Sequence, residues 1–268
     1  MTDRYAVIGN PVAHSESPWI HARFARATGQ DIEYLRIEAP RDGFAPALQE
    51  FRAAGGRGAN VTLPFKEEAL RRCASLSTRA RAAGTANTLR FDEGGIWGDN
   101  TDGAGLMRDL VVNLGRRIAG ARVLLAGAGG AAQGVLGALL EAGVARIVIA
   151  NRTVARAVAL AARHPGAPLA ACGYGELAGE SFDLVINATS AGLEGAALPL
   201  PAGVFARGAL AYDMVYGRHT PFLAAARAAG AAAHDGSGML VEQAAESFLA
   251  WRGVRPDTAP VLAELRAA

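Results

Sequence analysis

The sequence predicts an α/β protein of two domains, and three observations support this. Apolar runs of strand length alternate with helix-length segments along most of the 268 residues. Hydrophobic residues make up 51% of the chain and charged residues 19%, a composition typical of chains that bury a core. The length suits two domains of modest size.

The middle of the chain predicts a doubly wound, Rossmann-type domain over residues 105–238. Residues 122–126 form an apolar strand, a glycine-rich turn follows, and residues 133–142 have the composition of a helix. A second strand at 146–150 completes a βαβ unit of about 30 residues. Further parallel strands are expected at 182–187 and 208–213, and a further helix at 220–229.

The first hundred residues predict a second α/β domain, over residues 1–104. Helix 17–28 is expected to begin with Ser17 as its N-cap and Pro18 in its first turn. Another helix is expected near Lys66. Residues 239–268 read as helices that the pattern alone does not place. The remaining expected elements are strands 4–9, 32–37 and 58–62 and helix 44–54.

Composition argues against several classes of protein. The net charge is only +2 and the basic residues are scattered, so we expect no nucleic-acid partner. Cys73 and Cys172 lie far apart and outside any CxxC pair, which favours a reduced, cytoplasmic protein without a metal site. No segment resembles a signal peptide or a membrane span.

A glycine-rich turn follows the strand at 122–126 and predicts a dinucleotide site. The turn, Gly127-Ala128-Gly129-Gly130-Ala131-Ala132, fits the pattern G-x-G-x-x-G/A. The first glycine allows the tight turn, the second allows close approach of a pyrophosphate, and the small Ala132 allows helix and strand to pack closely. An ordinary tight turn is the alternative, but the flanking strand, helix and strand favour the dinucleotide.

The end of the second strand of the βαβ unit indicates which dinucleotide. A site for NAD usually has Asp or Glu there, whereas this chain has Asn151-Arg152-Thr153 and then Arg156. Two guanidinium groups and two short polar side chains suit a 2′-phosphate, so we expect NADP(H). Solvent-facing arginines of an arginine-rich chain are the alternative.

One lysine stands among the 27 Lys and Arg residues, at Lys66. Unlike arginine, a lysine can lose its proton when it is desolvated, which suits it to proton transfer. It ends the segment Asn60-Val-Thr62-Leu-Pro-Phe-Lys66, one of several polar clusters at predicted strand ends. Others contain Ser15 and Ser17, Asn87, Asp102, Asn187 to Gly192, Asp213 to Tyr216, and Asp235 to Gln243.

Taken in this order, from Gly9 to Gln243, the clusters resemble the shikimate dehydrogenase family. The resemblance implies a reversible, NADPH-dependent reduction of 3-dehydroshikimate to shikimate, on the route to chorismate and the aromatic amino acids. It also implies an N-terminal substrate domain, an NADP-binding domain, and C-terminal helices that return to the substrate domain. A monomer or homodimer is expected.

The resemblance also assigns residues. It implies Lys66 and Asp102 as the catalytic pair. The implied substrate-binding residues are Ser15, Ser17, Asn60, Thr62, Lys66, Asn87, Asp102, Tyr216 and Gln243. The implied cofactor-binding residues are Gly127, Ala128, Gly129, Gly130, Ala131, Asn151, Arg152, Thr153, Arg156, Thr189, Ser190, Met214, Gly238 and Met239.

The chemistry agrees with these roles, because a positioned acid–base residue supplies the proton without a metal. Three alternatives stay open. The first is a relative acting on quinate or an amino-sugar-like analogue, with broader substrate or NAD use. The second is a dehydrogenase of folate intermediates, which would not require Ser15, Ser17, Asn87 and Asp102 together. The third is a regulatory NADP-binding protein, which would not require Lys66 and Asp102.

Overall fold

The computed structural model describes residues 2–267. The chain forms two compact units. Unit 1 comprises residues 1–106 and 240–268, and unit 2 comprises residues 107–239. Helices of residues 240–268 therefore belong to the same unit as the N-terminal strands, so the expected return of the C-terminal helices is confirmed.

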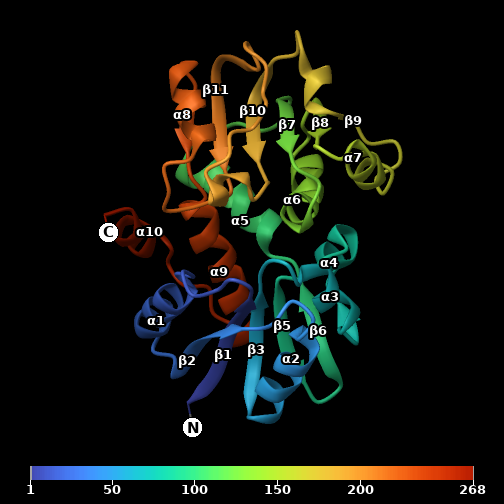
Figure 1. The fold of residues 1–268 in the computed structure, drawn as a ribbon. Helices are drawn as coiled ribbons and strands as arrows, with labels where there is room; N and C mark the ends of the chain where they lie inside the picture. Colours follow the sequence, from blue (N-terminus) through green and yellow to red (C-terminus); the bar gives the residue numbers. More distant parts are fainter. Residues whose placement is uncertain (1, 268) are drawn as a thin grey trace. The chain divides into compact units, whose positions relative to one another are not determined.

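Unit 1 is built on a mixed sheet of six strands in the order β2-β1-β3-β5-β6-β4 (Figure 1). The strand β1 pairs in parallel with β2 and β3, whereas β5 runs antiparallel to β3 and β6. The β5–β6 hairpin was not predicted. The strands are β1 (Asp3–Gly9), β2 (Ile32–Glu38), β3 (Gly56–Val61), β4 (Ser75–Leu76), β5 (Thr88–Asp92) and β6 (Gly95–Asp99).

Helices cover this sheet with two apolar clusters. Phe44 and Leu48 of α2 pack with Phe65 against strand residues such as Ile8 and Leu89. In the other cluster, α1, α9 and α10 lie side by side although they are far apart in the sequence (Figure 1). The helices are α1 (Ser17–Thr28), α2 (Phe44–Ala53), α3 (Lys66–Arg71), α4 (Thr78–Ala83), α5 (Asp102–Arg108), α9 (Ser237–Arg252) and α10 (Ala259–Ala267).

The predicted N-cap of the first helix is wrong. The cap position is Glu16, and its side chain makes no capping bond. Ser17 is the first helical residue, and its backbone N–H donates to the Ser15 hydroxyl at 3.3 Å. The Ser15 hydroxyl thus accepts from the first N–H of the helix, whereas a capping side chain would accept from the N–H of the second or third helical residue.

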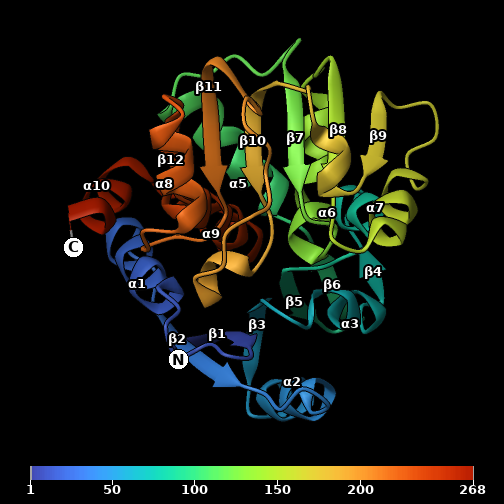
Figure 2. The same cartoon turned by 45° about the horizontal axis from the view of Figure 1, so that its top comes forward.

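Unit 2 contains a parallel sheet in the order β12-β11-β10-β7-β8-β9 (Figure 2). Read from β9, this is the 3-2-1-4-5-6 order of the Rossmann fold, with the topological switch point between β7 and β10. The strands are β7 (Arg122–Ala126), β8 (Arg146–Ala150), β9 (Leu169–Cys172), β10 (Phe182–Asn187), β11 (Phe205–Asp213) and β12 (Ala232–His234).

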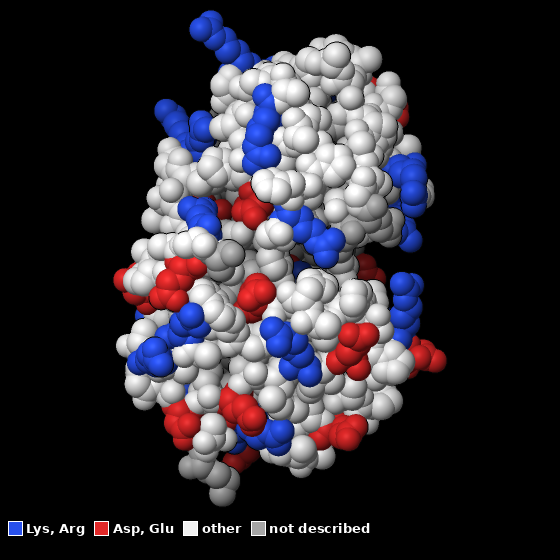
Figure 3. Space-filling view, turned by 60° about the vertical axis from the view of Figure 1, so that its left-hand side comes forward, with Lys and Arg blue, Asp and Glu red and all other residues white. Residues whose placement is uncertain are grey.

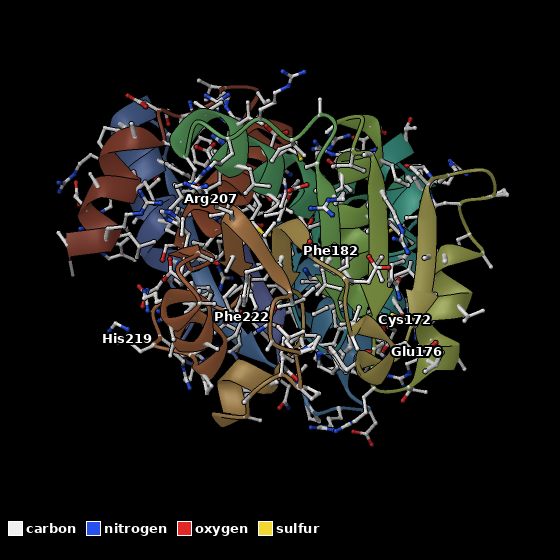
Figure 4. All side chains as sticks on the ribbon, turned by 90° about the horizontal axis from the view of Figure 1, so that it is seen from above. Cys172, Glu176, Phe182, Arg207, His219 and Phe222 are labelled. Atoms are coloured by element: carbon white, nitrogen blue, oxygen red, sulfur yellow. The ribbon has the colours of Figure 1, made fainter. Side chains whose placement is uncertain are left out.

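The core of unit 2 explains why its strands read as continuous apolar runs. Both faces of the central strands are buried, and Phe182 of β10 and Phe222 of α8 contribute to one cluster (Figure 4). A π-helical turn, η1 (Asp109–Asn113), follows α5, and short 3-10 turns occur at η2 (Tyr174–Leu177) and η3 (Ala191–Glu194). The helices are α6 (Gly130–Glu141), α7 (Val154–Ala161) and α8 (Pro221–Ala228).

Charges of both signs are interspersed on the face shown in Figure 3, which fits the small net charge. Within residues 2–267, no helix combines the length and the apolar character that a bilayer-spanning segment requires.

His21 of α1 is an unusual core residue of unit 1. It is fully buried and stacks on Tyr34, with ring centroids 4.3 Å apart, beside Phe24 and Trp251. Neither ring nitrogen has a hydrogen-bond partner among the described residues. Burial lowers the pKa of His21 to about 3, and the neighbouring Asn60 amide opposes this only partly.

We predict that His21 makes the protein less stable in weak acid. The unfolded chain binds a proton at about pH 6.5 and the folded chain only at about pH 3, so stability falls as the pH drops through that window. At pH 5 the effect is about 2 kcal/mol. Urea unfolding of wild type and His21→Phe at pH 7.5 and pH 5 measures it. The variant should lose less stability between the two values, and equal losses would contradict the prediction.

Candidate functional site

Lys66 and Asp102 meet at the centre of the polar interior of unit 1. Lys66 is the first residue of α3 and Asp102 the first of α5. The Lys66 Nζ donates to Asp102 Oδ2 at 2.6 Å, and the two side chains are only 13% and 6% exposed. Removing either partner would leave a charge uncompensated in a buried place, which is strongly destabilising.

Asn87 is a second hydrogen-bond donor to the Asp102 carboxylate. Its Nδ2 donates to Asp102 Oδ1 at 2.9 Å, so each carboxylate oxygen has a donor. The same amide nitrogen lies 2.9 Å from Thr101 Oγ1 and 3.3 Å from Gln243 Oε1, and the amide oxygen accepts from the Thr101 N–H at 2.8 Å. Asn87 therefore joins β5, α5 and α9.

Asn60, at the end of β3, continues the network. Its Oδ1 accepts from the Tyr34 hydroxyl at 2.8 Å. Its Nδ2 lies 3.1 Å from Asn87 O, 3.1 Å from Thr88 Oγ1 and 2.9 Å from Ser247 Oγ. Tyr34 and Ser247 lie outside the polar clusters noted in the sequence, and Thr88 had no predicted role.

Ser15 and Ser17 are both buried, and the Ser15 hydroxyl donates to the Ser17 hydroxyl at 3.2 Å. Burial raises the pKa of Tyr34 well above its usual range, and a hydrogen bond with the Ser17 side chain opposes this shift. Tyr34 thus stays neutral and links the two serines to Asn60.

Thr62 lies against the loop that carries the serines. A Cβ placed on Gly9 would lie 2.3 Å from the Thr62 methyl carbon, so only glycine allows this approach. Eight of the predicted site residues therefore gather in unit 1: Ser15, Ser17, Asn60, Thr62, Lys66, Asn87, Asp102 and Gln243. The ninth substrate-site prediction, Tyr216, belongs to unit 2, just after β11.

The other predicted residues of unit 2 follow the carboxyl ends of its parallel strands, where α/β sheets bind ligands. Residues 127–131 follow β7, residues 151–156 follow β8, and Thr189 with Ser190 follow β10. Met214 follows β11, while Gly238 and Met239 follow β12 in the first turn of α9.

The glycine turn has the geometry that the sequence predicted. Gly127 has a φ of +113°, and a Cβ there would lie 2.9 Å from the Ala188 carbonyl oxygen. Gly129 is the N-cap of α6 with extended backbone, and a Cβ there would meet nothing within 4 Å. Open space before a helix N-terminus is the arrangement that receives a phosphate group.

A buried pair, Asn187 and Asp213, joins the ends of the neighbouring strands β10 and β11. Asn187 Nδ2 donates to Asp213 Oδ1 at 3.0 Å, and its Oδ1 accepts from the Thr189 hydroxyl at 2.7 Å. Asp213 Oδ2 accepts from the Thr220 hydroxyl at 2.6 Å. Burial raises the pKa of Asp213, and these hydrogen bonds oppose the shift. Neither Asn187 nor Asp213 had a predicted role.

Arg152 and Arg156 are exposed, and neither guanidinium pairs with a carboxylate within residues 2–267. Arg152 lies near Tyr174, and its charge partly offsets the rise in the pKa of Tyr174 that burial causes. Asn151 donates from Nδ2 to the Thr153 carbonyl at 2.9 Å. The two arginines therefore keep an uncompensated positive charge at the end of β8.

Gly238 is required by a close contact inside unit 2. A Cβ there would lie 1.9 Å from the carboxylate of Asp109, which is buried and accepts from the Tyr212 hydroxyl at 2.6 Å. The Met239 N–H donates to the same hydroxyl at 3.2 Å. Among the described residues, no group of three or more His, Cys, Asp or Glu side chains is placed to hold a metal ion.

Three family models match the chain in succession. Residues 7–89 match the shikimate dehydrogenase substrate binding domain. Residues 109–194 match the shikimate / quinate 5-dehydrogenase model, and residues 236–266 match the shikimate 5′-dehydrogenase C-terminal domain.

Relatives resemble the chain along its whole length. It is 60% identical to a shikimate dehydrogenase (NADP(+)) of Methylobacillus flagellatus, over 99% of this chain and 100% of the relative. Its fold matches the crystal structure of an Ael1 enzyme from Pseudomonas putida with a TM-score of 0.91 and 49% identity, covering 98% of each chain. It also matches shikimate 5-dehydrogenase of Thermus thermophilus in complex with NADP(H) and shikimate, with a TM-score of 0.88 and 37% identity over 99% of each chain.

We predict different outcomes for the substitution of Gly127 and of Gly129 by alanine. Gly127→Ala forces an L-residue to a positive φ against the Ala188 carbonyl, and should destabilise the protein by about 1–3 kcal/mol. Gly129→Ala has free space and should change stability by less than about 0.5 kcal/mol, while its methyl group obstructs a dinucleotide. Denaturant unfolding and calorimetric titration with NADP separate the two. A Gly129→Ala variant that binds NADP as wild type does would contradict the assignment of the loop.

Proposed function

This chain belongs to the shikimate dehydrogenase family, and from that premise we propose that it catalyses the reversible NADPH-dependent reduction of 3-dehydroshikimate to shikimate. The observation that carries the proposal is the buried Lys66–Asp102 ion pair, held by Asn87. The test is NADPH formation from NADP with shikimate, with quinate or with neither. Turnover of quinate at a rate like that of shikimate would favour the broader relative.

We assign proton transfer to Lys66. Reduction of a ketone to an alcohol adds a hydride to the carbonyl carbon and a proton to the oxygen, and NADPH supplies the hydride when bound. Lys66 Nζ donates the proton to that oxygen and takes one back from solvent, and the reverse reaction returns the proton to Nζ. Asp102 Oδ2 holds the ammonium group in place, since it accepts from Nζ at 2.6 Å.

The remaining polar side chains of unit 1 suit a small hydroxylated carboxylic acid. The hydroxyls of Ser15, Ser17 and Thr62 are neutral donors for the carboxylate. We assign the ring hydroxyls to Asn60, Asn87, Asp102 and Gln243. Tyr216 of unit 2 stays a proposed substrate-binding residue. These assignments make residues 1–104 with 239–268 the substrate domain.

The residues of unit 2 fit NADP, because the turn at Gly127 leaves open space at Gly129 and the arginines after β8 lack carboxylate partners. Residues 127–131 would hold the pyrophosphate. Asn151, Arg152, Thr153 and Arg156 would hold the 2′-phosphate. We assign the other cofactor contacts to Thr189, Ser190, Met214, Gly238 and Met239, which makes residues 105–238 the NADP domain. We also propose a cytoplasmic location and a monomer or homodimer.

Substitution of the ion pair tests the catalytic assignment. Lys66→Ala and Asp102→Asn should each lower kcat by about 10²–10⁴-fold, because general acid–base catalysis contributes that much. Lys66→Arg keeps the positive charge but releases no proton at neutral pH, so it should stay as slow as Lys66→Ala. Asp92→Asn is the matched control, since Asp92 forms an exposed pair with Arg90. A loss of only a few-fold in Lys66→Ala would reject the role.

Substitution of Arg152 tests cofactor choice. Arg152→Ala should lower kcat/KM with NADP by about tenfold to a hundredfold, because a charged hydrogen bond contributes about 1.5–3 kcal/mol. The value with NAD should change by less than about threefold, since NAD lacks the 2′-phosphate. Arg207→Ala on β11, which is also exposed (Figure 4), serves as the control. Equal losses with both cofactors would contradict a 2′-phosphate role.

A further inference from the structure

The edge strand β2 holds the loop that carries Ser15 and Ser17. The guanidinium of Arg36 donates twice to one acceptor, the Ser15 carbonyl oxygen, from Nε at 2.9 Å and from a terminal nitrogen at 2.6 Å. Two residues further along β2, Glu38 accepts from the Val12 N–H at 3.5 Å. Both side chains point to the same side of the strand, since residues two apart share a face.

The charge of Arg36 is not neutralised in this position. Other arginines of unit 1, such as Arg23, Arg79 and Arg252, pair with carboxylates. Within residues 2–267, the Arg36 guanidinium makes no ion pair with a carboxylate, and its acceptor is a neutral carbonyl. A full positive charge therefore lies next to the backbone of Ser15.

The two serines need such a charge if they bind an anion. Their hydroxyls are neutral, and Lys66 is already paired with Asp102. Three acidic residues lie on the same loop and strand: Glu33 pairs with Arg4, whereas the negative charges of Glu16 and Glu38 oppose anion binding. A guanidinium fixed at Ser15 offsets them and makes the potential at the serine pair favourable for a carboxylate.

We propose that Arg36 is a positioning and specificity residue for the substrate carboxylate: it fixes the Ser15 loop on β2 and supplies the positive charge that the serine pair lacks. The inference rests on the proposed function, because it takes the serine pair as the carboxylate site. It concerns binding of the anion rather than proton transfer at Lys66, so it predicts an effect on KM and not on kcat.

The experiment compares Arg36→Met, which removes the charge and both donors, with Arg36→Lys, which keeps the charge and loses the forked geometry. In Arg36→Met, the shikimate KM and the Kd from calorimetry without cofactor should rise about tenfold, with kcat within about twofold of wild type. Arg36→Lys should fall between Arg36→Met and wild type. The wild-type KM should rise with ionic strength, and this dependence should be weaker in Arg36→Met.

The methyl ester of shikimate separates charge from structure, because it lacks the anion. The ratio of kcat/KM for shikimate to that for the ester should fall in Arg36→Met and stay unchanged in Arg23→Met, the matched control whose arginine pairs with Glu264 on the surface. If Arg36→Met lost activity equally with the acid and the ester, or if its Kd for shikimate were unchanged, the inference would be wrong. Turnover of shikimate by wild type would still support the proposed function. No turnover of shikimate by wild type would overturn both.

Discussion

The ion pair of Lys66 and Asp102 is the constraint on which the polar interior of unit 1 depends. Burying two charges is costly unless further hydrogen bonds satisfy the remaining lone pairs and protons. Asn87 meets that need at Asp102 Oδ1, and Asn87 is in turn fixed by Thr101 and Gln243. The pair therefore requires β5, α5 and α9 to meet at one place. The polar contact of α9 at Gln243 thus adds to its apolar packing against α1 within the same unit.

Unit 2 meets a different constraint, because backbone contacts hold the ends of its parallel strands close together. The turn after β7 and the segment after β10 are tied by a hydrogen bond from the Ala188 N–H to the Ala126 carbonyl at 2.8 Å. Gly127 sits so close to Ala188 that no side chain fits between them. The Asn187–Asp213 pair extends this order to the end of β11. Contacts within the chain thus hold these strand ends together.

The sequence predicted the parts of this molecule that depend on local pattern. The apolar runs predicted β7, β8 and β10 because strands buried on both faces lack polar alternation. The glycine turn was predictable because its spacing follows from backbone geometry at Gly127. The predicted cap failed because Ser17 is already the first helical residue, which makes Glu16 the cap position. Tyr34 and Ser247 were missed because their partner Asn60 lies 26 and 187 residues away, and no local pattern reports a contact at such a separation.

Arg36 was missed for a related reason. A polar side chain on an edge strand is expected to face solvent. Arg36 instead holds the loop that follows β1, the strand next to β2 in the sheet.

The positions of arginine and lysine in unit 1 follow the different chemistry of the two side chains. Arginines of unit 1 form ion pairs, as Arg79 does with Asp99 at 2.6 Å and Arg255 with Glu242 at 2.8 Å. The planar guanidinium group is always protonated, so it suits a permanent ion pair. Such a group is unsuited to proton exchange near neutral pH. The only lysine of the sequence lies where its amine is largely shielded from solvent and pairs with the Asp102 carboxylate, which the Asn87 amide also contacts. In an arginine-rich chain, the one position that has lysine is the position to which we assign proton transfer.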